Sequence, residues 1–351
     1  MKNCGIVGYG RIGSGKGRDY TLLPRIYYPY SIREAIEVSG EGVLSGVSDT
    51  SSLALEEVPQ GVPKFDSYHE MLEKIPLDFL AVTTRAKERY SVFESGIRNG
   101  IKLFHLEKPL CTSFVQLENL TNMCRQESVQ FSYGALRRHL YPYKLVKSLI
   151  DSKRYGDLKN VTINYGSTNL FWTHPHSIDL ILFYVGKYKK YKIQQVMGGS
   201  LQSKIVGGMR EIISDPILDS VVISFDDKQI AEITDGPAQN ISLECQNYVF
   251  RINQDGREVT IQKLSENEEV IWKESELEST EGFNVVLQKL LKSNVTDSEG
   301  DIYDAMVDSF RGQELLFEIC LKLYLQQTPI KRQIDRNQFS FRGMNYDGFF
   351  A

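Results

Sequence analysis

A length of 351 residues exceeds what one hydrophobic core usually supports, so we expect two domains. Hydrophobic residues make up 41% of the chain and charged residues 25%, as in an ordinary globular protein. The formal net charge of −4 gives no basic excess for binding phosphate backbones, which argues against nucleic-acid binding as the main task.

The cysteines and the apolar runs predict a cytoplasmic protein that does not associate with membranes. The five cysteines are scattered, odd in number and without the spacing of metal ligands, so reduced thiols in a cytoplasmic protein are expected. No signal peptide is expected, and the sequence has no apolar run of about 18 residues, so no membrane association is predicted.

A glycine-rich turn follows the first apolar run. Residues 4–7 are expected to form a strand, and the next six residues read G-x-G-x-x-G, with Gly8, Gly10 and Gly13 at the glycine positions. Such glycines permit a tight turn, close approach of the backbone to a pyrophosphate and close packing of helix on strand. Arg11 and Ile12 lie inside this motif, which alone does not establish dinucleotide binding.

Residues 10–17 also match the first part of a P-loop, G-x-x-x-x-G-K. Gly17 stands where a P-loop needs a serine or threonine hydroxyl for magnesium, so phosphate hydrolysis is disfavoured. Glycines, prolines and tyrosines crowd residues 14–32, which predicts an inserted loop, with the helix itself running from Ser31 to Val38. The loop is either a lid over cofactor or substrate or a packing feature, and the sequence leaves both open.

The second strand, residues 42–47, is followed by Ser48 and Asp49. An acid at that strand end suits the ribose 2′-hydroxyl of NAD and opposes the 2′-phosphate of NADP by like charge, so NAD is predicted in preference to NADP. Asp49 follows Gly13 at more than the usual spacing of about twenty residues. The inserted loop accounts for the excess.

Strands and helices continue to alternate up to residue 134. Helices are expected over residues 67–74, 88–98 and 113–127, and strands over 78–84, 101–106 and 130–134. Ser67 and Glu70 are placed to form a capping box at the first of these helices. This alternation predicts a doubly wound parallel sheet.

Polar residues end two of these strands. Thr83 and Thr84 end one strand, and Glu107, Lys108 and Pro109 end the next. Open α/β sheets bind their ligands at the carboxyl ends of the strands, so a lysine at this position is a candidate ligand contact. The alternative for this segment alone is an ordinary charged turn.

Taken in order, these motifs resemble the glucose-fructose oxidoreductase / inositol dehydrogenase / MocA (GFO/IDH/MocA) family. The resemblance implies a dinucleotide-binding domain followed by an α+β domain whose open sheet carries the substrate site and often mediates oligomerisation. It also implies that Lys108 contacts both the nicotinamide and the reacting oxygen. The cofactor contacts that it implies are Gly8, Gly10, Arg11, Ile12, Gly13, Asp49, Thr83, Thr84, Glu107 and Lys108. One departure is Arg85, because the family commonly has proline there.

An arginine-rich turn begins the second domain. Arg137 and Arg138, followed by Tyr141, resemble the family's turn into a helix expected over residues 143–152. Guanidinium groups are planar bidentate donors, so these arginines are candidates to bind a carboxylate or phosphate of substrate or cofactor. The alternative is pairing with acids of the same chain, which is slightly favoured for one of the two.

His176 is the candidate proton acceptor. Pro175 suits the first turn of a helix that continues to Gly186, and His176 and Asp179 lie on one face of it. A helix N-terminus disfavours imidazolium, so a histidine there can stay neutral and exchange protons near pH 7. A lone histidine is more often a structural partner, but the spacing His-x-Ile-Asp resembles the family's second-domain motif and favours a catalytic His176.

Trp172 departs from that motif, since many members carry an aspartate four residues before the histidine. His174 is a candidate replacement in a proton relay. His174 and His176 lack a third ligand at clear spacing, so no metal is expected. The substrate contacts predicted are Arg137, Tyr141, Trp172 and Asp179.

From residue 220 onward, apolar and polar residues alternate, which predicts an antiparallel meander followed by helices over residues 282–291 and 303–326. The expected fold is α/β. Residues 1–133 form an N-terminal Rossmann domain with a doubly wound parallel sheet, to which the C-terminal helix or tail can return. Residues 134–351 are expected to form an α+β domain with a mainly antiparallel open sheet, to which the resemblance assigns substrate binding and oligomerisation.

The function expected from the resemblance is an NAD-dependent oxidoreductase. It would transfer hydride between nicotinamide and a secondary alcohol or ketone of a sugar, sugar derivative or cyclitol, as a cytoplasmic homodimer or homotetramer assembled through the C-terminal sheet. The approach to His176 resembles members found with bacterial surface-sugar and nonulosonic acid pathways. The alternative is a catalytically silent sensor or scaffold that binds dinucleotide, and Trp172 is its main support.

Overall fold

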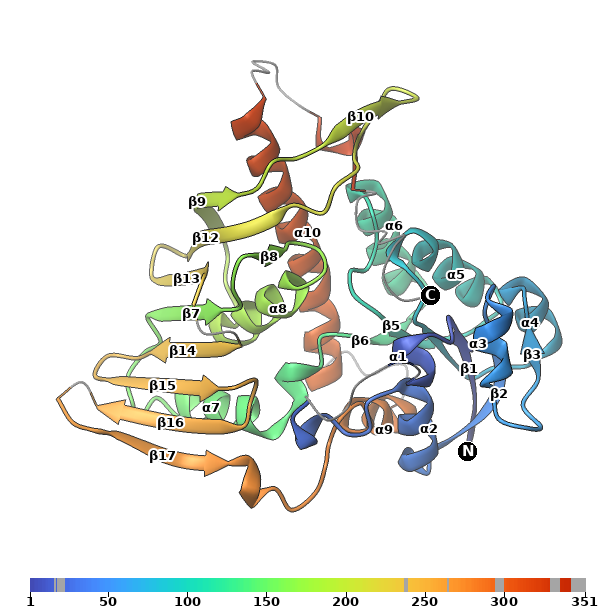
Figure 1. Ribbon diagram of the computed structural model, residues 1–351, viewed down its shortest axis with the longest axis horizontal. Coiled ribbons are helices and arrows are strands. Elements are labelled where there is room, and N and C mark those ends of the chain that lie inside the picture. Colours follow the sequence, from blue (N-terminus) through green and yellow to red (C-terminus); the bar gives the residue numbers. More distant parts are fainter. Residues whose placement is uncertain are drawn as a thin grey trace.

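The computed structural model of the protein describes residues 1–15, 17, 23–236, 239–263, 265–293, 300–328 and 335–341. Figure 1 shows a smaller sheet with its helices on one side, a large open sheet on the other, and the long helix α10 between them. This arrangement confirms the expected fold class, a Rossmann sheet joined to a mainly antiparallel α+β sheet.

The first sheet has six parallel strands in the order β3-β2-β1-β4-β5-β6. The strands are β1 Lys2–Val7, β2 Gly42–Ser48, β3 Lys64–Phe65, β4 Phe79–Val82, β5 Leu103–Leu106 and β6 Gln130–Tyr133. This strand order is typical of dinucleotide-binding sheets. The chain adds β2 and β3 on one side of β1 and then β4, β5 and β6 on the other, and sheets of this type bind ligands in the crevice outside the carboxyl ends of the strands at this switch.

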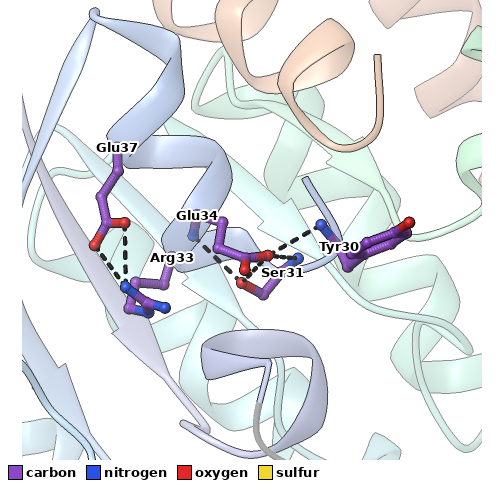
Figure 2. A network of polar contacts seen from close by, with 5 residues as sticks. All are labelled: Tyr30, Ser31, Arg33, Glu34 and Glu37. Carbon is purple, nitrogen blue, oxygen red and sulfur yellow. Dashed lines mark hydrogen bonds and ion pairs between the residues drawn. The ribbon is translucent and has the colours of Figure 1, made fainter. Parts of the chain in front are cut away.

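The helices of this domain are α1 Arg11–Ser14, α2 Ile32–Ser39, α3 Ser52–Glu56, α4 Tyr68–Lys74, α5 Ala86–Arg98 and α6 Phe114–Gln126. Figure 2 shows the start of α2, where the Ser31 hydroxyl accepts a hydrogen bond from the Glu34 amide. The Glu34 carboxylate in turn accepts from the amides of Tyr30 and Ser31, both at 3.1 Å, which completes a capping box. Arg33 and Glu37 pair at 2.9 Å on the exposed side of the same helix.

The starts of α1 and α4 test two expectations, an interrupted helix after β1 and a capping box at Ser67. α1 is a single turn that ends at Gly15, whose φ of 92° is left-handed, so the glycines do interrupt the usual long helix after β1. The capping box expected at Ser67 is wrong, because the Ser67 side chain makes no cap hydrogen bond at the start of α4.

The described end of the inserted loop packs against the second domain. It contains the 3-10 helix η2 Arg25–Tyr27, and Ile26 is fully buried. The Gly282 amide donates to the Ile26 carbonyl at 2.9 Å, and the Tyr27 hydroxyl donates to Asp255 at 2.8 Å. These contacts give this part of the loop a packing role. Residues 16 and 18–22, on which the lid interpretation also depends, lie outside the described residues.

The second sheet has the order β17-β16-β15-β14-β7-β13-β12-β8, with β9 also paired to β12. Its strands are β7 Asn160–Asn164, β8 Thr168–Asn169, β9 Tyr191–Gly198, β12 Ile217–Phe225, β13 Gln229–Thr234, β14 Asn240–Glu244, β15 Tyr248–Asn253, β16 Glu258–Lys263 and β17 Glu268–Lys273. Every pair is antiparallel except β13 with β7. Buried and half-buried residues alternate along β7 and β14, so one face of this sheet meets helices and the other is more open.

Helices join the two sheets. α7 Tyr141–Asp151 and α8 His174–Val185 contact the second sheet, and α9 Asn284–Lys292 contacts β5, β6 and α2 of the first domain. α10 Asp301–Gln327 contacts α8, β9, α6 and β6, so it packs on both domains. The remaining 3-10 helices are η3 Leu136–His139, η4 Glu274–Glu276 and η5 Arg336–Gln338.

A third, small sheet was not expected from the sequence. It consists of β10 Ser203–Val206, β11 Met209–Ile212 and β18 Phe339–Phe341. Phe341 stacks on Phe317 of α10 with 4.4 Å between ring centroids. None of the helices in the described parts of the chain combines the length and apolarity required to cross a membrane.

Candidate active site

The glycine turn after β1 is packed against the end of β4. Gly8 has a φ of 93°, and a Cβ there would lie 2.8 Å from the backbone of Thr83 and Thr84. A Cβ on Gly13 would collide with the Gly8 carbonyl. By contrast, no described atom lies within 4 Å of a Cβ position on Gly10. Gly8 and Gly13 therefore serve close packing, and the space beside Gly10 fits the approach of a pyrophosphate.

Asp49 stands beside this turn at the end of β2. Its carboxylate accepts hydrogen bonds from the Tyr9 amide at 2.6 Å and from the Ser51 amide at 2.8 Å. The Gly8 amide donates to the Ser48 carbonyl at 2.8 Å, which joins the turn to the same strand end. A half-buried carboxylate held in this way fits a ribose diol and disfavours a phosphate in the same place.

The two threonines after β4 have different surroundings. The Thr83 hydroxyl donates to the carbonyls of Gly8 and Val7, so it braces the glycine turn. The Thr84 hydroxyl is buried and has no hydrogen-bond partner among the described residues. A buried polar atom without a partner beside the crevice fits a bound polar ligand. Arg11 and Arg85 are exposed at the starts of α1 and α5, and Ile12 is half-buried in α1.

Glu107 lies in a buried polar pocket at the end of β5. The His105 Nε2 lies 3.6 Å from the Glu107 Oε1, and the Lys108 amide donates to the Glu107 Oε2 at 3.2 Å. Burial alone raises the pKa of Glu107, but His105, Lys108 and Arg89 outweigh it and lower the pKa overall. A Cβ on Gly134 would lie 2.6 Å from the Glu107 Oε1, so glycine at the end of β6 leaves room for this carboxylate.

Arg89 of α5 is a buried arginine that the sequence analysis did not single out. Its guanidinium donates to the carbonyls of Pro109 and Thr84, and burial lowers the pKa of Arg89 to about 10. The Lys108–Pro109 peptide bond is cis. The Gln313 Oε1 of α10 accepts from the Leu110 amide at 2.7 Å. The turn that carries Lys108 is therefore held from both domains.

Lys108 reaches from the first domain to the second. Its Nζ donates to the Trp172 carbonyl at 2.6 Å and lies 4.2 Å from the centroid of the Trp172 ring. The pKa of Lys108 is lowered to about 8, mainly by burial and also by Arg89 and Arg137, against the opposing effects of Glu107 and Asp215. An amine with this pKa exchanges protons near physiological pH, as general acid–base catalysis requires.

The two histidines of α8 differ in burial. His174 is fully buried, its Nε2 lies 3.1 Å from the Thr168 hydroxyl, and its Nδ1 lies 3.1 Å from the Ser177 hydroxyl. Burial lowers the pKa of His174 to about 4, so the ring is neutral with both nitrogens engaged. His176 is half-buried in the first turn of the helix, and its amide donates to the Thr173 carbonyl. The access that a proton relay needs is therefore better at His176.

Asp215 is a carboxylate that the sequence analysis missed. Its Oδ1 accepts from the Phe171 amide at 2.9 Å, and its Oδ2 accepts from the Trp172 amide at 3.0 Å. Burial raises the pKa of Asp215 to about 7 against the opposing effects of these amides and of Lys108. Asp215 precedes β12 in a short polar segment that has no periodic signal, and only the pairing of β12 with β8 brings it near Trp172.

Both arginines of the arginine-rich turn pair with acids of the same chain. Arg137 holds Asp255 through two hydrogen bonds, at 2.7 and 3.0 Å. Arg138 donates to Asp179 and to Asp308, each at 3.0 Å. Pairing with acids of the same chain, the alternative to ligand binding that the sequence favours for one arginine, is therefore found for both. Buried guanidinium groups require such counter-charges. Asp179, expected to contact substrate, is 4% exposed and is engaged by Arg138.

Tyr141 and Trp172 lie at different edges of the second sheet. The Tyr141 ring, 45% exposed, is 5.8 Å from the ring of Trp272 in β17. Trp172, 50% exposed, follows β8 at the opposite end of the strand order. Of these two predicted substrate contacts, Trp172 is the one that contacts Lys108, through its ring and its carbonyl. Across the described ranges, no group of three or more His, Cys, Asp or Glu side chains is placed to hold a metal.

Known proteins resemble the first part of this chain in sequence and nearly all of it in fold. Residues 2–135 match the model of an oxidoreductase family with an NAD-binding Rossmann fold, GFO/IDH/MocA. No curated protein matches the sequence.

Solved structures share the fold of nearly the whole chain at low sequence identity. A dehydrogenase from Chromobacterium violaceum is 16% identical, with a TM-score of 0.69 and coverage of 93% of this chain and 96% of that one. The WlbA dehydrogenase from the same organism, in complex with NADH and UDP-GlcNAcA, is 15% identical, with a TM-score of 0.68 over 93% and 94% of the two chains. The UDP-N-acetylglucosamine 3-dehydrogenase GnnA from Acidithiobacillus ferrooxidans is 13% identical, with a TM-score of 0.65 over 91% and 97%.

Proposed function

We propose that this chain, whose residues 2–135 match the GFO/IDH/MocA oxidoreductase family, is a member of that family and transfers hydride between NAD and a secondary alcohol or ketone of a sugar derivative. The observation that carries this proposal is the position of Lys108. It follows the carboxyl end of β5, and its Nζ donates a hydrogen bond to the Trp172 carbonyl of the second domain. A substrate bound between the domains would therefore meet an amine whose pKa burial has lowered to about 8.

The residues around the crevice fit a dinucleotide. The open space beside Gly10 would admit the pyrophosphate, Asp49 would accept hydrogen bonds from the ribose, and Thr84 offers a buried hydroxyl without a partner among the described residues. The bound cofactor would supply the hydride acceptor or donor. The charge of Asp49 supports NAD over NADP as the preferred cofactor.

The chain's own residues would manage the proton and the charge on oxygen. The Lys108 ammonium can stabilise the developing alkoxide and orient the substrate oxygen. The imidazole of His176, half-buried at the start of α8, can accept the hydroxyl proton. We assign no proton transfer to His174, because both of its ring nitrogens are already engaged by hydroxyls.

Nucleotide-linked sugars are the substrate class that we favour. Two structures with the same fold are named for such compounds, one by its UDP-GlcNAcA ligand and one by its UDP-N-acetylglucosamine 3-dehydrogenase activity. In this chain the half-exposed Trp172 ring beside Lys108 offers a flat apolar surface against which a sugar can pack. Free sugars and cyclitols are the competing classes.

The second candidate function is a dinucleotide-binding sensor or scaffold without turnover, and the tryptophan at position 172 is what favours it.

We further propose a homodimer or homotetramer formed through the more open face of the second sheet, on which half-buried residues of β7 and β14 lie. The free, buried cysteines among the described residues support a cytoplasmic protein.

The test is absorbance at the reduced-nicotinamide band during incubation with NAD and a panel of UDP-GlcNAc, UDP-GlcNAcA, myo-inositol and glucose. Turnover with a sugar that disappears in Lys108→Met, while NAD binding is retained, is the expected result. Binding of NAD without turnover of any sugar, in either direction, would favour the sensor. Absence of NAD and NADP binding would overturn both functions.

A further inference from the structure

The segment before β12 is joined to the segment that follows β8. Ile217 pairs with Asn169, and the Leu170 amide donates to the Pro216 carbonyl at 2.8 Å. The Asn169 side chain donates to the Asp215 carbonyl at 3.1 Å. These contacts place the side chain of Asp215 beside the peptide units that lead to α8.

The Asp215 carboxylate accepts hydrogen bonds from two consecutive backbone amides. Its two oxygens accept from Phe171 at 2.9 Å and from Trp172 at 3.0 Å, which fixes the orientation of both peptide units. The carbonyl of Trp172 accepts from the Lys108 Nζ at 2.6 Å. Asp215 therefore fixes the two peptide units that directly precede the carbonyl to which Lys108 donates.

The charge of Asp215 also acts on Lys108. Two carboxylates, Glu107 and Asp215, raise the pKa of Lys108, and the guanidinium groups of Arg89 and Arg137 lower it. A neutral loop-fixing side chain would provide hydrogen bonds without this charge. Burial raises the pKa of the Asp215 carboxyl to about 7, so a charged group is costly here, and hydrogen bonding to the loop alone does not require one.

We infer that Asp215 is a positioning residue for Lys108: it fixes the two peptide units that precede the Trp172 carbonyl, to which the Lys108 Nζ donates, and it places a carboxylate in the surroundings of this amine. Position 172 itself carries a tryptophan, and the carboxylate arrives from the segment before β12. The catalytic consequence rests on the proposed function, whereas the effect on the lysine does not.

Tryptophan fluorescence tests the inference without a substrate. The chain has two tryptophans, so Trp272→Phe leaves Trp172 as the sole reporter, with its ring 4.2 Å from the Lys108 Nζ. A cation so close to an indole affects its emission, so a pH titration of this variant should show a transition near pH 8. Lys108→Met in the same background should abolish that transition.

The decisive comparison adds Asp215→Asn to the Trp272→Phe background. The midpoint should move to lower pH by about 1 unit, as expected when a neighbouring opposite charge is removed. Asp219→Asn removes an aspartate from β12 itself and serves as the matched control, with an unchanged midpoint expected. An unchanged midpoint in Asp215→Asn, or an equal shift in the control, would overturn the inference. If Asp215→Asn loses its far-UV dichroism, Asp215→Ser, which retains one small acceptor, provides the same comparison.

Steady-state kinetics then separate this inference from the proposed function. With a sugar that the enzyme turns over, Asp215→Asn should lower kcat about 10-fold or more and shift the limb of the pH profile that reports Lys108, with NAD affinity unchanged. Asp219→Asn should keep the wild-type kcat and profile. If no sugar is turned over, the proposed function fails, but the fluorescence midpoint still decides the inference. Turnover of Asp215→Asn with a wild-type pH profile would overturn the catalytic consequence.

Discussion

Replacing Asp255 by Asn tests whether Arg137 is a structural cation or a substrate ligand. The Asp255 carboxylate accepts two hydrogen bonds from Arg137, and it also accepts from the hydroxyls of Tyr27 at 2.8 Å and Tyr143 at 3.1 Å. The side chains of Arg137 and Asp255 are 13% and 6% exposed. The substitution therefore leaves a buried guanidinium without its counter-charge and weakens an acceptor shared by three donors.

The expected loss in free energy of unfolding is about 3–5 kcal/mol, the usual cost of breaking a buried ion pair from one side. Denaturation in urea, with a slope that matches the wild type, measures it. Asp157→Asn is the matched control, because the Lys153–Asp157 pair is exposed by 64% and 85% and should contribute nothing measurable.

A loss in free energy of unfolding below about 1 kcal/mol in a folded Asp255→Asn variant would refute this account of Arg137 as a buried structural cation. A loss that small is what an exposed ion pair contributes. The variant Arg137→Met tests the same question from the other side of the ion pair. We expect it to lower stability and leave the KM for the sugar unchanged. An increased KM with unchanged stability would instead make Arg137 a substrate ligand.

Three further predictions concern the site. Asp49→Asn should improve NADP binding relative to NAD by about 1–3 kcal/mol, measured by titration of both dinucleotides, and an unchanged ratio would remove the argument for NAD. Lys108→Met and His176→Asn should each lower kcat by roughly 10²–10⁴ with little change in NAD affinity, and normal turnover in both would exclude the proposed catalytic roles. Because the folded-state pKa of His174, about 4, lies below the ordinary value of 6.5, stability should fall as pH drops from about 6.5 to 4, by roughly 3 kcal/mol. His139, with a pKa lowered by burial to about 3, contributes in the same window, so His174→Asn should flatten the measured pH dependence only in part.

Much of the first domain could be predicted because its signals are local. Each strand is a short apolar run, and the residues at its carboxyl end follow directly in the sequence, as Gly8, Asp49 and Lys108 do. Parallel strands align these ends along one edge of the sheet. The sequence therefore predicted the parallel sheet and the position of Lys108 just after the carboxyl end of one of its strands.

The rest of the site depends on contacts between distant segments. Asp215 meets Trp172 only because β12 pairs with β8, and Arg138 meets Asp308 only because α10 crosses α8. No spacing along the chain distinguishes these acids from others. Ser67 failed as a cap for a related reason, since a favourable residue type does not fix the side-chain rotamer that capping needs. The sequence analysis also assigned no element to residues 187–219, where β9, β10 and β11 lie.

The return of α9 and α10 to the first sheet has a consequence for synthesis of the chain. β6 ends at Tyr133, whereas its partner α10 begins at Asp301, and the rings of Phe131 and Phe310 lie 5.5 Å apart across that contact. While a ribosome adds the intervening residues, the nascent first domain presents apolar surface that only the last helices will cover. Domains emerging in this state are prone to aggregate. We therefore expect chaperone dependence during translation, and expect residues 1–133 expressed alone to be less soluble than the full chain.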